Sequence, residues 1–426
     1  MQEASIRKRR VAVIGLGYIG LPTACIFATN GIRVLGVDQN PAVIARILAG
    51  EPIPAEPEVN ALAKAAVASG NLELKSSVEA ADVYIIAVPT PVGPDHRADL
   101  GYVESALADI RPLLQRGNLI VLESTVPPTT TRDFIVPEIE RGGLRVGVDV
   151  MVAHCPERVR PGTTLLELVN NERIIGGVDE ESAAQAAELY SVFVQGRIHL
   201  TDATTAEMVK VMENTFRDVN IALANDFAKL AGVVGIDVWE AIRLANNHPR
   251  VSILSPGPGV GGHCIPVDPW FLVQMGEGAS RVIRAAREVN DAMPQYVVDI
   301  LLREADLNGG HVAVLGLAYR AGLGDMRESP SLAIINRLEQ AGVKVRAHDP
   351  YIGPSGHLMG NGSLSDVIAG ADAILVATDH QAYCDLDPMS IAGLVRQRFV
   401  LDTRNCLVVD RWARAGFRVV TLGRSV

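Results

Sequence analysis

Three closely spaced glycines behind an apolar segment constrain the fold of the N-terminal region most strongly. Residues 11–14 form an apolar run typical of a buried strand, and Gly15, Gly17 and Gly20 follow it at the spacing GxGxxG. Such glycines permit a tight turn, a close approach of the backbone to a pyrophosphate, and close packing of a helix on the strand. The sequence therefore predicts a strand, a turn and a helix that bind a dinucleotide.

The segments that follow extend this pattern into an α/β sheet. A second apolar segment, residues 33–38, ends in Asp38, an acid suited to accept hydrogen bonds from ribose hydroxyls and to repel a 2′-phosphate. We therefore expect NAD as the cofactor. Two more apolar segments precede Thr90 and Thr125, which we expect near the nicotinamide, although each is equally typical of a helix cap or a turn.

Length, charge and cysteine content limit the class of protein. A chain of 426 residues predicts two or three domains, and we assign them to 1–200, 201–305 and 306–426. The net charge of −10 argues against nucleic-acid and anionic-membrane partners. Five cysteines without a CxxC pair suit a reducing cytoplasm and indicate neither a disulfide framework nor a metal site.

The middle of the chain predicts one long helix. Thr204 and Glu207 have the spacing of a capping box, and no helix breaker follows until Gly232, which gives a helix of about 30 residues. Its large apolar side chains fall on one face, which we interpret as a homodimer surface. The opposite face carries Lys210, Asn214 and Arg217, which suit either a solvated surface or a ligand cleft.

A loop rich in glycine and proline, residues 256–269, delivers the thiol of Cys264 four positions ahead of the carboxylate of Asp268. His248 and Arg250 precede it and would suit an anionic substrate. For a lone cysteine the alternative is an inert, buried thiol in a tight turn.

The C-terminal part repeats the beginning of the chain in outline. Residues 311–320, 343–349 and 371–377 resemble the first, second and third strand segments, but the glycine fingerprint is absent. We therefore expect a second Rossmann-like domain that has lost dinucleotide binding. Arg320, Arg327 and Arg404 are available there for phosphates.

These parts together indicate an oxidation that proceeds beyond an aldehyde. An alcohol dehydrogenase needs no thiol, whereas a thiolate can add to an aldehyde and carry it through a thioester to an acid. Lys210 and Asn214 could stabilise the oxyanion, and Asp268 could handle protons or water.

In residues 15–20, 206–214, 261–268 and 325–330 the chain resembles, in order, the motifs of the UDP-glucose/GDP-mannose dehydrogenase family. The resemblance implies two Rossmann-like, doubly wound domains joined by a long dimerising helix. It makes Cys264 the nucleophile, Lys210 a proton donor or acceptor and oxyanion partner, Asn214 an oxyanion donor, and Asp268 the carboxylate that assists water. It places Thr125 and Glu157 beside that water and the nicotinamide, and assigns the cofactor contacts to Gly15, Gly17, Tyr18, Ile19, Gly20, Asp38, Thr90, Thr125 and Arg327.

Within the family, residues 213–220 and 247–264 look most like the branch that oxidises UDP-N-acetyl-D-mannosamine. The resemblance assigns the sugar-nucleotide contacts to Arg158, Val159, Lys210, Asn214, Arg217, His248, Arg250, Gly261, Tyr319, Arg320 and Arg404. Two departures from the UDP-glucose branch support this branch, since Val267 and Pro161 stand where that branch has a lysine and a glutamate. UDP-N-acetylglucosamine is the alternative substrate, and a non-catalytic protein that binds NAD and nucleotide sugars is the alternative of another class.

Overall fold

The computed structural model describes residues 6, 8–51, 56–276, 278–307, 309–353 and 363–424. The chain forms two compact units, one made of Met1–Glu213 with Trp270–Gly276 and the other of Asn214–Pro269 with Glu277–Val426. The boundary falls inside one continuous helix, α9 (Ala203–Val234). The three-part division predicted from the sequence stays a prediction.

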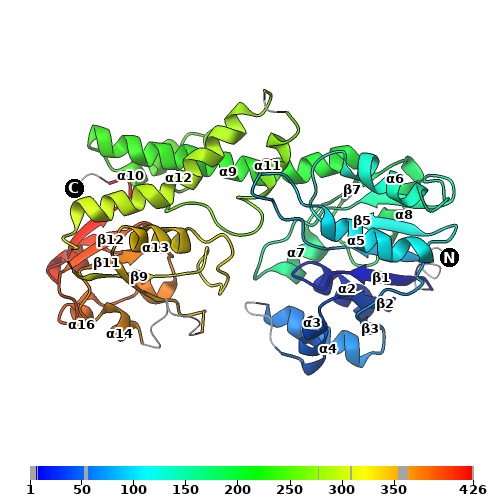
Figure 1. Ribbon diagram of the computed structural model, residues 1–426, viewed down its shortest axis with the longest axis horizontal. Coiled ribbons are helices and arrows are strands. Elements are labelled where there is room, and N and C mark those ends of the chain that lie inside the picture. The colour runs from blue at the N-terminus through cyan, green and yellow to red at the C-terminus, as the bar shows by residue number, and fades with distance from the viewer. Residues whose placement is uncertain are drawn as a thin grey trace. The chain divides into compact units, whose positions relative to one another are not determined.

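The first unit is built on an eight-stranded sheet in the order β3-β2-β1-β4-β5-β6-β7-β8 (Figure 1). All neighbouring strands are parallel except β6 and β7, which are antiparallel. The strands are β1 (Arg10–Ile14), β2 (Arg33–Val37), β3 (Leu72–Lys75), β4 (Val83–Ile86), β5 (Leu119–Leu122), β6 (Met151–His154), β7 (Arg173–Gly177) and β8 (Ile198–Asp202).

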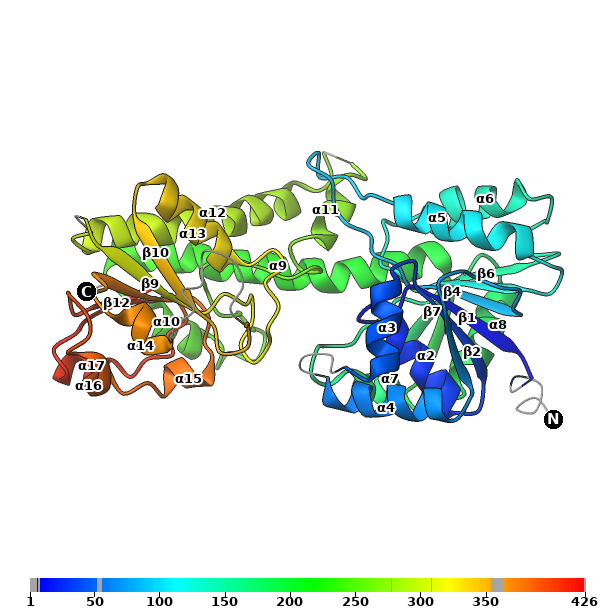
Figure 2. The ribbon, with the colours of Figure 1, turned by 60° about the horizontal axis from the view of Figure 1, so that its bottom comes forward.

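Helices cover both faces of this sheet, as Figure 2 shows. Side chains of α2, α4, α7 and α8 share one apolar core with the sheet, and side chains of α5 and α6 share the other. The elements are α2 (Gly20–Thr29), α3 (Pro41–Ala49), α4 (Pro57–Ala68), α5 (Gly101–Ile110), η1 (Arg111–Leu113), the π-helical turn η2 (Thr131–Ile135), α6 (Val136–Glu140), α7 (Thr164–Asn170) and α8 (Glu180–Tyr190).

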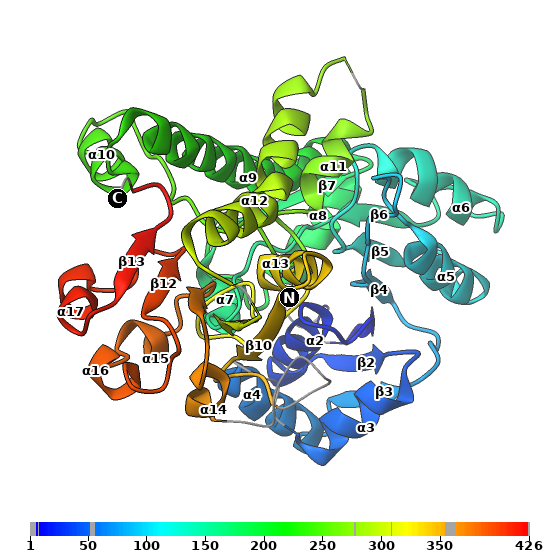
Figure 3. The ribbon, with the colours of Figure 1, turned by 60° about the vertical axis from the view of Figure 1, so that its left-hand side comes forward.

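The second unit contains a parallel five-stranded sheet in the order β10-β9-β11-β12-β13. Figure 3 shows its strands β10, β12 and β13. Helices α12 and α13 cover one face, while α14 to α17 cover the other. The elements are β9 (His311–Leu315), α13 (Pro330–Gln340), β10 (Lys344–His348), α14 (Leu364–Ile368), β11 (Ala373–Val376), α15 (Gln381–Cys384), α16 (Pro388–Ile391), β12 (Phe399–Asp402), α17 (Val409–Arg414) and β13 (Arg418–Thr421). The prediction of two Rossmann-like domains and a long central helix is confirmed.

Three further helices complete the chain: α10 (Val238–Ala245), α11 (Asp268–Val273) and α12 (Arg281–Glu304). In the second unit α12 packs along α9 through a buried polar contact, in which Arg287 donates to Asp218 and Asn290 donates to the same carboxylate. Asn225 of α9 donates in turn to Asn290, at 2.9 Å. These contacts fix the register of the two helices, because a shift by one turn would leave a buried charge unpaired.

Helix α9 begins as predicted, but the capping box is wrong. Asp202 caps the helix, with its carboxylate accepting from the amide and the hydroxyl of Thr205. Glu207 is fully buried and accepts instead from the amides of Thr129 and Thr131, each at 2.6 Å. Burial raises the pKa of Glu207 to about 7. The residue thus ties α9 to the segment after β5 rather than to its own first turn.

The two faces of α9 differ as the periodicity predicts. The side of the helix that packs within the protein is formed by small and polar residues such as Ala206, Asn214 and Ala228. The large apolar side chains are exposed and comprise Met208, Met212, Phe216, Leu223 and Leu230. Within the described part of the chain, no helix has the length and apolar character needed to cross a membrane.

Candidate active site

The glycine turn of the first unit has the space that a dinucleotide requires. Gly15 has a φ of +91°, and a Cβ there would lie 2.5 Å from the carbonyl oxygen of Ala87. A Cβ on Gly20 would lie 1.8 Å from the carbonyl oxygen of Gly15. A Cβ on Gly17, in contrast, would meet no atom within 4 Å. Two glycines are therefore required by packing, whereas Gly17 leaves open space beside the turn.

The other predicted cofactor contacts surround this turn. Asp38 accepts from the amide of Leu16 at 3.0 Å, so its carboxylate holds the glycine turn against the end of β2. No side chain caps α2 at Ile19, which leaves its first turn for an anion such as a pyrophosphate. The hydroxyl of Tyr18 donates to Glu56 at 3.0 Å. These features fit NAD.

Thr90 and Thr125 are brought together by the loops after β4 and β5. The hydroxyl of Thr90 donates to the carbonyl oxygen of Thr125 at 2.5 Å. The two loops lie side by side because β4 and β5 are parallel neighbours whose carboxyl ends meet at the same edge. Thr90 thereby stabilises the loop that carries Thr125.

Glu157 and Arg158 follow β6 at the same edge of the sheet. Glu157 is buried, accepts from Arg173 at 2.9 Å, and also accepts from the backbone amide of Arg158 at 2.6 Å. The guanidinium of Arg158 donates to Glu213 of α9 at 3.0 Å. Val159 packs against the adjoining core. Both predicted polar residues are thus fixed by ion pairs.

Lys210 lies on the part of α9 that belongs to the first unit and is half-buried. Its charge reaches His154, the last residue of β6. Burial, with a smaller contribution from Lys210, lowers the pKa of His154 to about 3. The imidazole of His154 is therefore neutral at physiological pH and does not repel the side chain of Lys210.

The second unit holds the cysteine turn. The carbonyl oxygen of Cys264 accepts from the amide of Asp268 at 2.8 Å and from that of Val267 at 3.1 Å. Asp268 is buried, and its Oδ2 accepts from the side-chain amide of Asn214 at 2.5 Å. One turn of chain therefore positions the thiol and the carboxylate, and α9 supplies the amide that holds that carboxylate.

The glycines before Cys264 allow its loop to pack closely on the segment after β9. A Cβ on Gly261 would lie 2.6 Å from both the Cβ of Tyr319 and the carbonyl oxygen of Glu328. Gly262 has a φ of +91° and donates to the carbonyl oxygen of Arg327 at 3.0 Å. Gly261 and Tyr319, two predicted substrate contacts, are therefore neighbours.

Arg327 and Asp325 form a bidentate ion pair beside this loop, with its shortest distance at 2.6 Å. Burial alone would raise the pKa of Asp325, but the hydrogen bonds from Arg327 hold it below its usual value. Burial raises the pKa of Tyr319, the charge of Asp325 raises it further, and Cys264 contributes electrostatically in the same direction. The thiol therefore lies within electrostatic reach of the segment from Tyr319 to Arg327.

Arg217, His248 and Arg250 are exposed in the second unit. The segment before the cysteine loop is held to α9 at two points: Asn220 accepts from the amide of Leu254 at 3.0 Å, and Asn225 accepts from that of Gly257 at 2.8 Å. These asparagines were not singled out in the sequence. Asn225 lies on the same face of α9 as Asn214, because eleven residues make about three turns, whereas Asn220 lies about 120° around the helix from Asn214.

The second sheet keeps the acid at the end of its second strand but uses it differently. Asp349 accepts from the amides of Leu317 and Ala318, at 2.8 and 2.9 Å, as Asp38 does from Leu16. It also contacts the Nε2 of His380 at 3.1 Å and is buried. Asp349 therefore has partners within the protein both on the loop after β9 and at His380, and the loss of dinucleotide binding in this unit stays a prediction.

Two of the arginines predicted to bind phosphates, Arg320 and Arg404, lie in loops of the second unit that follow strands β9 and β12. Arg404 follows β12 and donates to Asp379 at 3.0 Å. Its Nη1 would be 2.7 Å from a Cβ on Gly257, so it lies against the loop that leads to Cys264. Arg320 is half-buried next to Tyr319.

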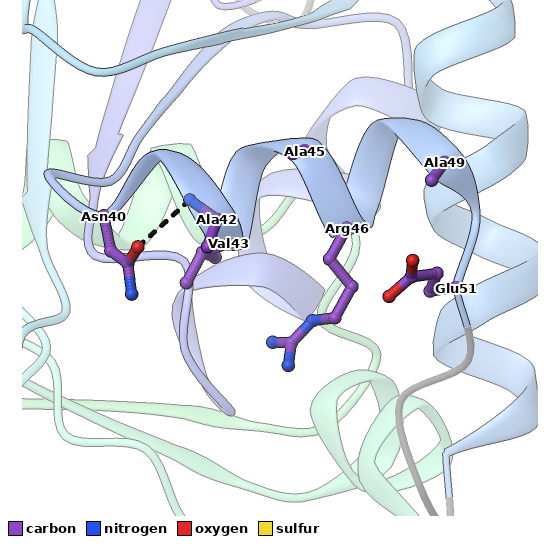
Figure 4. A pocket seen from close by; sticks show the side chains of 7 residues that line it. All are labelled: Asn40, Ala42, Val43, Ala45, Arg46, Ala49 and Glu51. Carbon is purple, nitrogen blue, oxygen red and sulfur yellow. Dashed lines mark hydrogen bonds between the residues drawn. The ribbon is translucent and has the colours of Figure 1, made fainter.

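A hollow of about 480 Å³ runs along α3, where Arg46 and Glu51 extend beside the helix (Figure 4). Asn40 caps the helix by accepting from the amide of Ala42 at 3.0 Å. None of the predicted site residues lines the hollow, and we assign no chemistry to it. Among the described residues, no three His, Cys, Asp or Glu side chains are arranged to hold a metal ion.

The sequence analysis missed a buried set of residues next to Glu157, namely Thr23, Glu123, Arg173 and Tyr190. Glu123 had a detectable signal, because it is an acid directly after the apolar strand β5. Arg173 had none, since its position depends on the antiparallel pairing of β7.

Comparisons with known proteins place the chain in one family. Three models of the UDP-glucose/GDP-mannose dehydrogenase family match in order: the NAD binding domain at residues 9–194, the central domain at 204–292, and the UDP binding domain at 313–409.

The relatives match over nearly their whole length. The UDP-N-acetyl-D-mannosamine dehydrogenase of Methanocaldococcus jannaschii is 47% identical, over 97% of this chain and 96% of its own. The NDP-N-acetyl-D-galactosaminuronic acid dehydrogenase of Ralstonia nicotianae is 43% identical, over 95% and 98%. The solved structure of the UDP-D-ManNAc dehydrogenase of Pyrococcus horikoshii has a TM-score of 0.90 at 44% identity, over 97% and 99%. The chain belongs to the UDP-glucose/GDP-mannose dehydrogenase family.

Proposed function

We propose that this protein oxidises the C6 hydroxymethyl group of UDP-N-acetyl-D-mannosamine to a carboxylate, with NAD as the oxidant. The substrate assignment rests on the full-length similarity to proteins named for that activity, which are 47% and 44% identical to this chain. The net reaction consumes the alcohol, two NAD and one water, and yields the carboxylate, two NADH and three protons.

The first unit binds the cofactor in this proposal. Gly17 leaves the space that a pyrophosphate would occupy, and Asp38 stands at the end of β2 for the ribose. NAD supplies the hydride acceptor for both oxidation steps. Thr125, held by Thr90, and Glu157, held by Arg173, would flank the nicotinamide and the reacting water.

Cys264 carries the substrate between the two oxidations. Its thiolate sulfur adds to the C6 aldehyde carbon, and the resulting thiohemiacetal loses a hydride and a proton to become a thioester. The positive charge of Lys210 stabilises the negative charge on the oxygen at C6 in each step. Asn214 supports the same oxygen, since a side-chain amide carries two N–H donors and only one is needed for Asp268.

Asp268 would take the proton of the water that hydrolyses the thioester. Water then adds to the thioester carbon, the C–S bond breaks, and the thiolate of Cys264 is restored together with the carboxylate product. The short contact with Asn214 supports this role, because the donated hydrogen bond orients the carboxylate.

We also assign the contacts with the sugar nucleotide to Arg158, Val159, Arg217, His248, Arg250, Gly261, Tyr319, Arg320 and Arg404. The second copy of a homodimer would cover the exposed apolar face of α9. The five cysteines of the chain, among which there is no CxxC pair, suit a reducing compartment such as the cytoplasm.

The test is a panel of sugar nucleotides with NADH stoichiometry: UDP-N-acetylmannosamine, UDP-N-acetylglucosamine, UDP-N-acetylgalactosamine and UDP-glucose. We expect the highest kcat/KM with UDP-N-acetylmannosamine, and two NADH for each uronate formed. Cys264→Ala should form no uronate, while Cys384→Ala, a matched change at another half-buried thiol, should keep the stoichiometry.

A preference for another sugar would contradict the substrate, and one NADH with a released aldehyde would contradict the thioester route. No NADH with any of the four sugars, in a protein that still binds NAD, would favour a non-catalytic binding protein.

A further inference from the structure

A buried cluster of two carboxyl groups and one guanidinium lies at the carboxyl edge of the first sheet, where β5 and β6 end. Arg173 is 2.9 Å from Glu157 and 3.8 Å from Glu123, measured between side-chain nitrogen and oxygen atoms. All three side chains are nearly or completely buried, and the proposed mechanism uses only Glu157. The cluster therefore needs an explanation of its own.

Strand pairing explains how the three residues meet. In the antiparallel pair of β6 and β7, His154 lies opposite Gly176 and Ala153 opposite Gly177. Continued by three residues, this register brings Arg173, at the start of β7, opposite Glu157. Glu123 follows β5 directly, and its neighbour Leu122 pairs with His154.

Glu123 is also connected to the dinucleotide-binding helix. It accepts from the hydroxyl of Thr23 on α2 at 3.2 Å and from that of Tyr190 on α8 at 3.0 Å. Arg173 lies over the ring of Tyr190, 4.8 Å from its centroid. These contacts fix the position of Glu123 whether or not it is ionised.

One guanidinium can neutralise only one of the two carboxylates. Arg173 is closer to Glu157, so its guanidinium pairs with Glu157 and leaves Glu123, among the described residues, without a cation at ion-pair distance of its own. Burial, followed by the charge of Glu157, raises the pKa of Glu123 to about 8. Burial also raises the pKa of two ionisable neighbours, that of Cys155 to about 12 and that of Tyr190 well above its usual value.

We propose that Glu123 is a positioning residue for the oxidation, which as a neutral acid leaves Arg173 to Glu157 and so holds the Glu157 carboxylate in place. When Glu123 loses its proton, it competes for Arg173 and weakens the hold on Glu157. This inference rests on the proposed function, because Glu157 matters through its role beside the nicotinamide and the water.

The test compares the pH dependence of kcat in the wild type and in Glu123→Gln, with saturating NAD and sugar nucleotide. In the wild type we expect kcat to fall as the pH rises through about 8. Glutamine keeps the shape but cannot ionise. The ratio of the variant's kcat to that of the wild type should therefore rise at least about threefold from about pH 7 to about pH 9.5, while both KM values change less than about threefold.

Two further variants separate positioning from a structural role. Tyr190→Phe removes a hydrogen bond that favours the ionised form of Glu123, so the alkaline fall in kcat should move to higher pH. Glu180→Gln, an exposed change on the same helix α8, should leave the profile unchanged.

Stability offers a second measurement. The folded-state pKa of Glu123 is raised, so the folded protein binds more protons than the unfolded chain between the ordinary glutamate pKa of about 4.5 and about 8. The stability that Glu123 contributes is therefore lost as the pH rises through this window. The fall in unfolding temperature across it should be smaller in Glu123→Gln.

An active wild type without an alkaline fall, or parallel profiles for the wild type and Glu123→Gln, would overturn the inference and leave the proposed function standing. Absence of NADH formation in the wild type with every sugar would instead contradict the proposed function itself. A lower unfolding temperature at all pH values with an unaltered profile would show a structural role only, and would also overturn the inference.

Discussion

Among the predicted catalytic residues, Asn214 and Asp268 have the best defined contact with each other. The two residues are 54 positions apart in the sequence. In the structure both are buried, and Nδ2 of Asn214 lies 2.5 Å from Oδ2 of Asp268. The hydrogen bond from the amide fixes the orientation of this buried carboxylate, which the proposed role as a general base requires.

We expect Asp268→Asn to lower kcat by about 100-fold, because the remaining amide cannot take a proton, whereas KM should change by less than about fivefold. Steady-state NADH formation measures both quantities. Asp226→Asn, which changes an exposed carboxylate on α9, is the control and should retain wild-type kinetics. A loss below about threefold in Asp268→Asn would show that another group activates the water.

Residues with a local signal were predictable, and residues that act through distant pairing were not. Cys264 and Asp268 share one glycine-rich turn, and Lys210 and Asn214 share one helical face. Arg173, in contrast, reaches Glu157 only because β7 runs against β6, and its sequence surroundings do not indicate this reversal. Glu207 shows the opposite error, since a capping-box spacing concealed a tertiary contact with Thr129 and Thr131.

At the level of elements, the glycine turn allows cofactor binding to be separated from folding. Gly17→Ala adds a methyl group in open space, so the fold should persist, while the approach of the pyrophosphate is obstructed. We expect the dissociation constant for NAD to rise at least about tenfold, measured by calorimetry, with an unfolding temperature close to that of the wild type.

Gly20→Ala is the matched change at the other end of the same motif. Its methyl group would lie 1.8 Å from the carbonyl oxygen of Gly15, so we expect destabilisation by about 2 kcal/mol or more, or failure to fold. Equal NAD affinity in Gly17→Ala and the wild type would contradict the assignment of this turn to the cofactor.

Long or strongly apolar elements were predicted well, and weakly patterned ones were not. The strands β1, β4 and β5 are continuous apolar runs, because helices cover both faces of their sheet. The edge strand β3, Leu72–Lys75, alternates with charged residues and has no such signal. The reversal at β7 follows from chain connectivity, which no local pattern encodes.

At the level of the whole molecule, the exposed apolar side of α9 requires a covering surface. Phe216 is 64% exposed and Leu230 57%, an unusual state for such side chains along one helix. The proposed second copy would bury both.

Phe216→Arg should therefore raise the dimer dissociation constant by more than about tenfold, because the interface would have to bury an unpaired charge. Analytical ultracentrifugation over a range of concentrations measures this change. Leu48→Arg, at an apolar position 59% exposed on α3, is the control and should leave the association unchanged. A wild-type protein that remains monomeric throughout would contradict the dimer.

The shared use of an acid in both sheets has a consequence for engineering cofactor preference. Asp38 holds the amide of Leu16, and Asp349 holds the amides of Leu317 and Ala318, although the second sheet has lost the glycine fingerprint. In both sheets the acid therefore fixes the loop after the first strand, and at Asp38 the proposed ribose contact would come in addition to this role. A redesign toward NADP that replaces Asp38 with a small neutral residue would remove the hydrogen bond to the Leu16 amide. It would thereby destabilise the glycine turn that has to bind the new cofactor. Such a redesign should therefore supply a new acceptor for the Leu16 amide before it adds a positive charge for the 2′-phosphate.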